Sequence, residues 1–574
     1  MPSPSRFPVF ARVGLLPALL ALAVVLGLGS YAETSDDGSL AWLFAGVLSG
    51  RPVASVPLYL HGYGHLLAAA YARFPAVPWL GGLLAGLLLM AGACWFAVAE
   101  RLLRPWLEPR GLVLVLVLVL VLLFVVSWLE SWLWFSHARV AVLLAGSAVL
   151  YAAQRPGRWG PLLLGLLGLG AAWLLRPSLA TLGFMAALPG AVLLAGSLRR
   201  AKPLLLGGAL LIVAATGLRA ATETPAEAQV RQRDTQLARI LDYEQLRPAP
   251  PTPLDSLGTA AVDGWLFGDT ALIDLVLRDG TYRFEAADFF GRTLPARLRL
   301  RLGLLGRDYF PLLLALLATA VAFGRRPPVA RQRWFWLVQA GFLAGLLGLA
   351  GFFKLPPRLA LPLLDFWLLT NLIFGLKPGA PVAGQVGAER PALPDTLARL
   401  KSRPVRWAMA VLALLVLLAY GLKTGHRTRV LRQEQRGHEQ TLRALRAADP
   451  NSVRVLAGTN DLLKSLSPFR VADVGPGPVL QLTGWPAQDV SQAALRRALT
   501  GLPGQPAALA RLTQPGVPGE TLPVTWILTR PTARWLGRRR VPGVPMLRFI
   551  DQGPLAASAD TALRRYRVQP GLQP

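Results

Sequence analysis

The run LVLVLVLVLVLLFVV, from Leu112 to Val126, decides the fold class of this chain. Its alternation of Leu and Val imitates a β-strand. However, the apolar stretch extends to about twenty residues, which suits a helix that crosses roughly 30 Å of hydrocarbon and is too long for one half-buried strand. The run therefore predicts a membrane-spanning helix.

Similar apolar runs recur along most of the 574 residues. Hydrophobic residues make up 53% of the chain, charged residues only 16%, and the mean hydropathy is +0.45. These values exclude a string of soluble domains and predict an α-helical polytopic membrane protein. We expect about eleven spans: 10–30, 79–99, one from 112, 134–154, two flanking Arg176-Pro177, 204–218, 309–323, 334–353, 357–376 and 406–422. The first lacks an obvious cleavage site, so we expect a retained anchor.

The distribution of basic residues predicts the orientation of these spans. With the N-terminus in the cytoplasm, the basic clusters at 101–110, 155–158, 199–202, 325–333 and 399–406 all become cytoplasmic, as the positive-inside tendency requires. We therefore expect a multi-pass protein of the bacterial inner (plasma) membrane with an external, periplasmic C-terminal domain. Four arginines between 297 and 307 fall on the expected external side. They indicate either an interfacial helix or a miscounted span.

The net charge of +29 does not indicate nucleic-acid binding, because many of the basic residues lie in short connections between apolar runs. The single cysteine, Cys94, excludes an intrachain disulfide. We expect a transmembrane domain over 1–422, with an external loop 31–77 and an external helical insertion 219–305. Residues 423–574 should form an α/β domain with strands at 453–457, 479–482 and 524–528 and a helix at 491–499. This segment holds 22 Lys and Arg against 9 Asp and Glu, which favours an anionic glycan or lipid headgroup as its partner.

The loop 31–77 contains the adjacent carboxylates Asp36 and Asp37. Transfer of a sugar to a hydroxyl requires removal of the hydroxyl proton, and a carboxylate within hydrogen-bond reach can accept it. The two acids also begin an amphipathic segment, so either could instead cap a helix. Both interpretations remain open from the residues alone.

Other polar residues near span ends are candidate ligands. His61 and His65 are four residues apart on an expected helix over 58–74, a spacing that suits a metal, an acceptor or simple interfacial contacts. The Glu of a His-Glu-x-x-His motif is missing, which excludes a zinc peptidase of that type. Arg176 at the boundary of two spans could grip a lipid phosphate or snorkel to headgroups.

Two further features complete the list of candidate residues. Glu130, Ser136, His137 and Arg139 form a second polar cluster at the external end of the third and fourth spans, and Arg358 is another candidate. Asp365 is the main ionisable residue expected inside a span. No glycine motif of the Walker or Rossmann type is present, so nothing supports a nucleotide-driven mechanism.

Several short motifs resemble those of the C-type (GT-C) polytopic membrane glycosyltransferases. They resemble more closely the motifs of a set of uncharacterised bacterial membrane proteins with a similar N-terminal region. They are Ser35-Asp-Asp37, Gly50-Arg-Pro52, Leu58-Tyr-Leu-His-Gly-Tyr-Gly-His65, Ala70-Tyr-Ala-Arg-Phe-Pro75, Pro78-Trp79, Phe135-Ser-His-Ala-Arg139, Leu174-Leu-Arg-Pro177, Leu237-Ala-Arg-Ile-Leu-Asp-Tyr243 and Gly484-Trp-Pro486. Many relatives have Asn-Asp-Asp where this chain has Ser35-Asp36-Asp37.

The resemblance implies an external active site, a polyprenyl-phosphate sugar as donor and an inverting transfer. It implies that Asp36 or Asp37 is the base and Arg176 a phosphate ligand, with His61, His65, His137, Arg139 and Arg358 as further substrate or lipid-phosphate contacts. A divalent metal is possible. We therefore expect a membrane glycosyltransferase that acts on a cell-envelope glycan or lipid acceptor. The alternative is a non-catalytic assembly or transport protein for envelope glycans.

Overall fold

The computed structural model describes residues 7–108, 111–249, 252–278, 280–324, 329–377, 403–449, 451–472, 474–514 and 523–571. The chain divides into two compact units, each assembled from three stretches. Unit 1 is Met1–Ser30, Leu83–Ala221 and Ala296–Val430, and unit 2 is Tyr31–Gly82, Thr222–Pro295 and Leu431–Pro574. Unit 2 thus contains the whole of the expected first external loop, most of the expected insertion 219–305 and most of the C-terminal segment 423–574.

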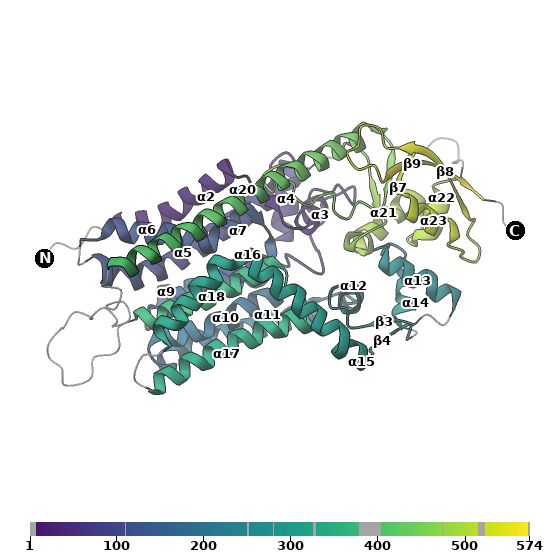
Figure 1. Cartoon of the computed structure of the whole chain (residues 1–574). Coiled ribbons are helices and arrows are strands. Elements are labelled where there is room, and N and C mark those ends of the chain that lie inside the picture. The colour runs from purple at the N-terminus through teal and green to yellow at the C-terminus, as the bar shows by residue number, and fades with distance from the viewer. Residues whose placement is uncertain are drawn as a thin grey trace. The chain divides into compact units, whose positions relative to one another are not determined.

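Apart from the short strand β2 (Trp134–Phe135), the regular structure described in unit 1 is helical (Figure 1). The elements, some of which extend into unit 2, are α1 (Phe7–Phe10), η1 (Ala11–Leu15), α2 (Leu16–Gly27), α5 (Trp79–Leu107), α6 (Val113–Leu123), η3 (Phe124–Trp128), α7 (Leu129–Leu133), α8 (His137–Ala153), α9 (Trp159–Leu175), α10 (Pro177–Ala195), α11 (Leu198–Thr222), α16 (Leu294–Phe323), α17 (Val329–Phe352), α18 (Pro357–Leu376) and α20 (Arg403–Ala447). The segments η1 and η3 are π-helical.

The described residues contain eight helices that are long and apolar enough to cross a membrane. They are Trp79–Leu107, Val113–Leu133, Pro177–Ala195, Leu198–Thr222, Ala286–Phe323, Gln332–Phe352, Pro357–Leu376 and Ala410–Ala447. Three shorter apolar helices, Ala11–Gly27, His137–Ala153 and Trp159–Leu175, coincide with the remaining expected spans. Each rises about 26 Å, slightly less than the hydrocarbon thickness. The prediction of a helical multi-pass membrane protein is confirmed.

Helix α8 lies at the centre of unit 1, since nearly all of its residues are buried. It packs against α9, α10 and α18. A Cβ placed on Gly183 of α10 would lie only 2.3 Å from the carbonyl oxygen of Val142 in α8. Small residues at such crossings let apolar helices approach closely, which is how helices associate where burial from water supplies no driving force.

The arginines between 297 and 307 lie in the first half of α16, continuous with the apolar second half. Arg297 is buried and donates to the carbonyl of Phe353, whereas Arg299 and Arg307 are exposed. The helix kinks at Tyr309, where φ is −122° and ψ is 25°. Pro311 explains this kink, because its ring crowds the preceding turn and it has no N–H to donate.

Unit 2 combines helices with a mixed five-stranded sheet (Figure 1). Its elements before the sheet are β1 (Tyr31–Ala32), α3 (Ser35–Phe44), α4 (Gly64–Arg73), α12 (Pro225–Leu237), η4 (Ala238–Asp242), β3 (Arg247–Pro248), α13 (Pro253–Asp263), α14 (Thr270–Arg278), β4 (Tyr282–Arg283), α15 (Ala286–Asp288) and η5 (Phe289–Thr293). The sheet region comprises β5 (Val453–Leu456), β6 (Val479–Gln481), η7 (Trp485–Gln488), α21 (Val490–Thr500), α22 (Gln505–Arg511), β7 (Val524–Thr529), α23 (Arg530–Arg538), β8 (Leu547–Pro554) and β9 (Leu563–Pro570).

The strand order is β6-β5-β7-β9-β8. Strand β5 pairs in parallel with β6 and β7, whereas β9 pairs antiparallel with β7 and β8. The strands expected at 453–457, 479–482 and 524–528 and the helix expected at 491–499 are confirmed as β5, β6, β7 and α21. The sheet shares one hydrophobic core with α13 and α14, in which Val262, Ile273, Val455 and Leu528 are fully buried.

Residues of the first loop pack against the C-terminal stretch within unit 2. The amide of Ala32 donates to the carbonyl of Leu466, at 2.9 Å, and the amide of Ser465 donates back to Ala32, also at 2.9 Å. The indole of Trp42 donates to the carbonyl of Ala472, at 2.9 Å. The segment carrying the adjacent acids is therefore held by residues more than 400 positions later in the chain.

Candidate functional site

Asp36 and Asp37 lie in the first turn of α3. The N-cap of this helix is Thr34, which has an extended backbone and makes no side-chain capping bond. Its hydroxyl donates instead to Asp36 Oδ2, at 3.1 Å. Neither acid is therefore the N-cap, although both have the favourable charge for a helix N-terminus.

Asp36 also accepts a hydrogen bond from a distant part of the chain. The Nε1 atom of Trp485 lies 3.1 Å from Asp36 Oδ1. Trp485 begins η7 after Gly484, whose φ of 78° suits glycine and whose amide donates to the carbonyl of Trp265. Tyr59 packs edge-on against the Trp485 ring, with centroids 5.2 Å apart. Two side-chain donors thus fix the orientation of the Asp36 carboxylate.

The two adjacent acids differ in exposure. Asp37 is 6% exposed and Glu33 is 5% exposed, whereas Asp36 is partly exposed. A general base must come within hydrogen-bond reach of the proton that it removes. Asp36 is accordingly the acid of this group that a substrate hydroxyl can more readily approach.

The histidines of the loop are arranged differently from the prediction. Helix α4 begins at Gly64, so His61 lies in the preceding turn and does not share a helix face with His65. Leu60 has a φ of 53°, a left-handed conformation that interrupts a helix. A Cβ on Gly64 would lie 1.9 Å from the carbonyl oxygen of Ala54, so the chain passes too closely here for a larger residue.

His61 is partly buried and His65 is exposed. Between them, burial raises the pKa of Tyr63 to about 12, so its phenol remains an O–H donor at neutral pH. Over the residues that the structure describes, no group of three or more His, Cys, Asp and Glu side chains is placed to hold a metal ion.

Unit 1 brings together three of the other predicted residues. His137 and Arg139 begin α8 and are each 1% exposed. Arg139 Nη1 donates to the carbonyl of Glu130, at 2.6 Å, and Arg176 Nη1 lies 3.5 Å from His137 Nε2. Arg176 occupies the extended break between α9 and α10 and is partly buried. Arg358 is partly buried in the first turn of α18.

A network of charged side chains next to this cluster was not predicted as a unit. Glu130 is 2% exposed and pairs with Lys423 at 3.2 Å and Arg427 at 2.9 Å. Arg427 also lies 3.2 Å from Asp308, and its guanidinium covers the Trp134 ring at 4.8 Å. The sequence signal that could have indicated this network is the pair Lys423 and Arg427, which are four residues apart just after the last apolar run and so lie on one helix face.

Asp365 is fully buried in α18, as expected of an ionisable residue within a span. Its polar surroundings are Ser127, Arg139 and Glu130. Ser127 belongs to the π-helical turn η3, and such turns are frequent at functional sites. Ionisable groups at this depth are costly and are commonly functional.

The contact between Trp485 and Asp36 predicts energetic coupling between these residues. Trp485→Phe and Asp36→Ala should each lower the melting temperature of the purified protein, because each removes the same hydrogen bond. The double variant should lose less than the sum, with a coupling of about 0.5–3 kcal/mol. Thermal unfolding in detergent measures this double-mutant cycle.

The matched control is Trp535→Phe, which removes an indole hydrogen bond to the carbonyl of Leu257 in the same unit. Its effect should add to that of Asp36→Ala within about 0.5 kcal/mol. If the effects of Asp36→Ala and Trp485→Phe were as additive as those of Asp36→Ala and Trp535→Phe, the hydrogen bond between Asp36 and Trp485 would be contradicted.

In comparisons with known proteins, no family model, no curated protein and no solved structure matches the chain.

Proposed function

We propose that this protein is a membrane glycosyltransferase, similar to the C-type enzymes that its motifs resemble. It transfers a sugar from a polyprenyl-phosphate donor to a cell-envelope acceptor at the external face of the bacterial inner membrane. The observation that carries the proposal is the partly exposed Asp36, oriented by Thr34 and Trp485. Only eight residues separate the end of the apolar helix α2 at Gly27 from Asp36, and this short connection supports a role for the acid close to the membrane surface.

In the proposed step, an acceptor hydroxyl oxygen attacks the anomeric carbon of the donor sugar. The bond between that carbon and the phosphate oxygen breaks, polyprenyl phosphate leaves, and the hydroxyl proton passes to the carboxylate of Asp36. Attack from the face opposite the leaving group inverts the anomeric configuration. The two hydrogen bonds to Asp36 fix the direction in which its oxygens accept the proton.

Arg176 is the proposed ligand of the donor phosphate, with His137 and Arg139 near it and Arg358 as a further candidate. A guanidinium binds a phosphate through two parallel N–H bonds. The boundary position between two apolar helices is where the phosphate of a lipid carrier would lie. Both the chemistry of its guanidinium and its position between α9 and α10 therefore support Arg176 as the phosphate ligand.

A transport or assembly role is the second candidate, and Asp365 favours it, because buried ionisable residues line many substrate and proton pathways. The two functions differ in what they require. An enzyme turns over in detergent solution, whereas transport is observed only across a sealed membrane.

Asp36→Asn should reduce sugar transfer by about 10²–10⁴-fold, because the amide cannot accept the proton. Asp37→Asn should retain substantial turnover, since that side chain is buried. Both are assayed with purified protein, polyprenyl-phosphate sugar and envelope acceptor in detergent, at matched amounts of folded protein. Full activity of Asp36→Asn would refute the proposed base, and a larger loss in Asp37→Asn would transfer the role to Asp37.

Arg176→Lys should weaken the apparent affinity for the lipid-linked donor by about tenfold, because lysine keeps the charge and loses the bidentate geometry. The affinity for the acceptor should not change. Arg199→Lys, on the exposed start of α11, is the matched control. An unchanged donor KM in Arg176→Lys would exclude the phosphate contact.

The proposed orientation predicts the location of two reporter fusions. Alkaline phosphatase fused after Gln569 should be active, because eleven spans place the C-terminal domain outside. The same reporter fused after Lys202 should be inactive, and a green fluorescent protein there should fluoresce, because that basic cluster is expected in the cytoplasm. If the fusion after Gln569 gives a signal only with green fluorescent protein and not with alkaline phosphatase, the C-terminal domain is cytoplasmic and an odd number of spans is refuted.

A further inference from the structure

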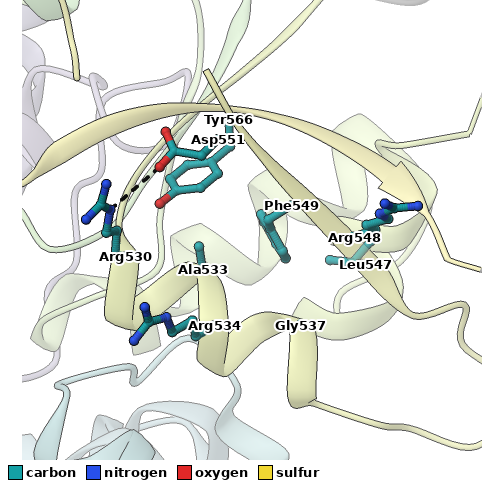
Figure 2. Close-up of a pocket in the computed structure, with 9 residues that line it drawn as sticks. All are labelled: Arg530, Ala533, Arg534, Gly537, Leu547, Arg548, Phe549, Asp551 and Tyr566. Atoms are coloured by element: carbon teal, nitrogen blue, oxygen red, sulfur yellow. Dashed lines mark ion pairs between the residues drawn. The ribbon is translucent and has the colours of Figure 1, made fainter. Parts of the chain in front are cut away.

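A pocket of about 390 Å³ lies between α23 and the sheet of unit 2 (Figure 2). Helix α23 contributes Arg530, Ala533 and Arg534, whose spacing of three and four residues puts them on one helix face. Strand β8 contributes Leu547 and Phe549 from one face of the strand, and Tyr566 comes from β9. A volume of this size suits one small molecule.

The charge of the pocket is positive. Asp551 is its acid, and its nearest partner is Arg564, at 2.6 Å, whose hydrogen bond lowers the pKa of that carboxyl. Arg530 lies further from Asp551, at 3.6 Å, and its side chain is 60% exposed. Arg534 makes no hydrogen bond or ion pair with any residue that the structure describes. The single carboxylate is thus bound most closely by Arg564, so Arg534 and the exposed, more distantly paired Arg530 can both turn to an anionic ligand.

A neutral donor completes the polar side of the pocket. Burial raises the pKa of Tyr566, and so does the neighbouring Asp551 carboxylate, whereas Arg564, Arg530 and Arg534 act in the opposite direction. The phenol therefore keeps its proton at neutral pH. Figure 2 shows the Tyr566 hydroxyl on the same side of the pocket as Arg530 and Arg534, whereas Arg548 lies at the opposite end.

The other wall of the pocket is apolar. Ala533 and Leu547 are buried, and Phe549 is partly exposed with one edge against Tyr566. A ligand that satisfies both walls carries an anionic group at one end and a compact body with apolar C–H groups at the other. An inorganic anion would leave the apolar wall uncovered, and a neutral sugar would offer no anionic partner to Arg534.

We propose that this pocket binds an acidic sugar, that is, a sugar ring that carries a carboxylate or a phosphate. Arg530 and Arg534 bind the anionic group, the Tyr566 hydroxyl donates to it, and the ring packs against Phe549. The proposal does not depend on sugar transfer at Asp36, because none of the pocket residues belongs to the proposed catalytic group.

The test measures binding to the full-length protein in detergent by isothermal titration calorimetry. The probes are glucuronate, glucose 6-phosphate, glucose and inorganic phosphate. At least one of the two acidic sugars should bind at least about tenfold more tightly than glucose and phosphate, and its affinity should fall as salt is added. Comparing glucuronate with glucose 6-phosphate identifies the preferred anion. Failure of both acidic sugars to bind would overturn the proposal, and so would equal binding of inorganic phosphate.

Arg534→Gln should weaken binding of the better sugar by about tenfold, because one guanidinium–anion contact is lost. Arg538→Gln is the matched control, since this exposed arginine lies on the same helix and does not line the pocket. Equal affinities of these two variants would refute the assigned site. Asp36→Asn should bind as the unchanged protein does, so loss of transfer and loss of pocket binding are separable results.

Discussion

The candidate site depends on the hydrogen bonds that tie the first loop to the C-terminal stretch. Apolar side chains of the loop such as Leu40, Leu43 and Phe44 are buried, but its polar groups are held by distant residues: Trp485 donates to Asp36, and Leu466 and Ser465 pair with Ala32. A hydrogen bond to a charged group contributes about 1.5–3 kcal/mol. These contacts therefore fix the carboxylate more firmly than the short helix α3 could do alone, since isolated helices of ten residues are marginal.

Charge burial imposes a second constraint, within unit 1. Glu130 is almost fully buried at the end of an apolar helix, and it is compensated by two cations from α20 and by the proximity of Arg139. Removing one member would leave a buried charge without compensation, which is strongly destabilising. The network therefore restricts how α20 can pack against α7 and α16, in a region where apolar contacts alone distinguish poorly between alternative packings.

The sequence predicted the helical membrane class because length and hydropathy are local signals. It also predicted β5, β6, β7 and α21, which have short buried apolar runs bounded by turn residues. It missed β8 and β9, because Arg548, Arg565 and Arg567 interrupt any apolar pattern in this exposed hairpin. The late start of α4 at Gly64 depends on a close approach to Ala54 that no periodicity encodes. The contact between Asp36 and Trp485 was beyond prediction for the same reason, although both residues lay in recognised motifs.

The separation of 449 residues between Asp36 and Trp485 also has a consequence for biosynthesis. Ribosomes add about 5–20 residues per second, so about 20–90 s pass between the synthesis of the acid and that of its indole partner. During this interval the loop has already left the ribosome without the residues that orient it. The loop that carries Asp36 can therefore reach its native geometry only after most of the chain has been made, so its assembly is a late step.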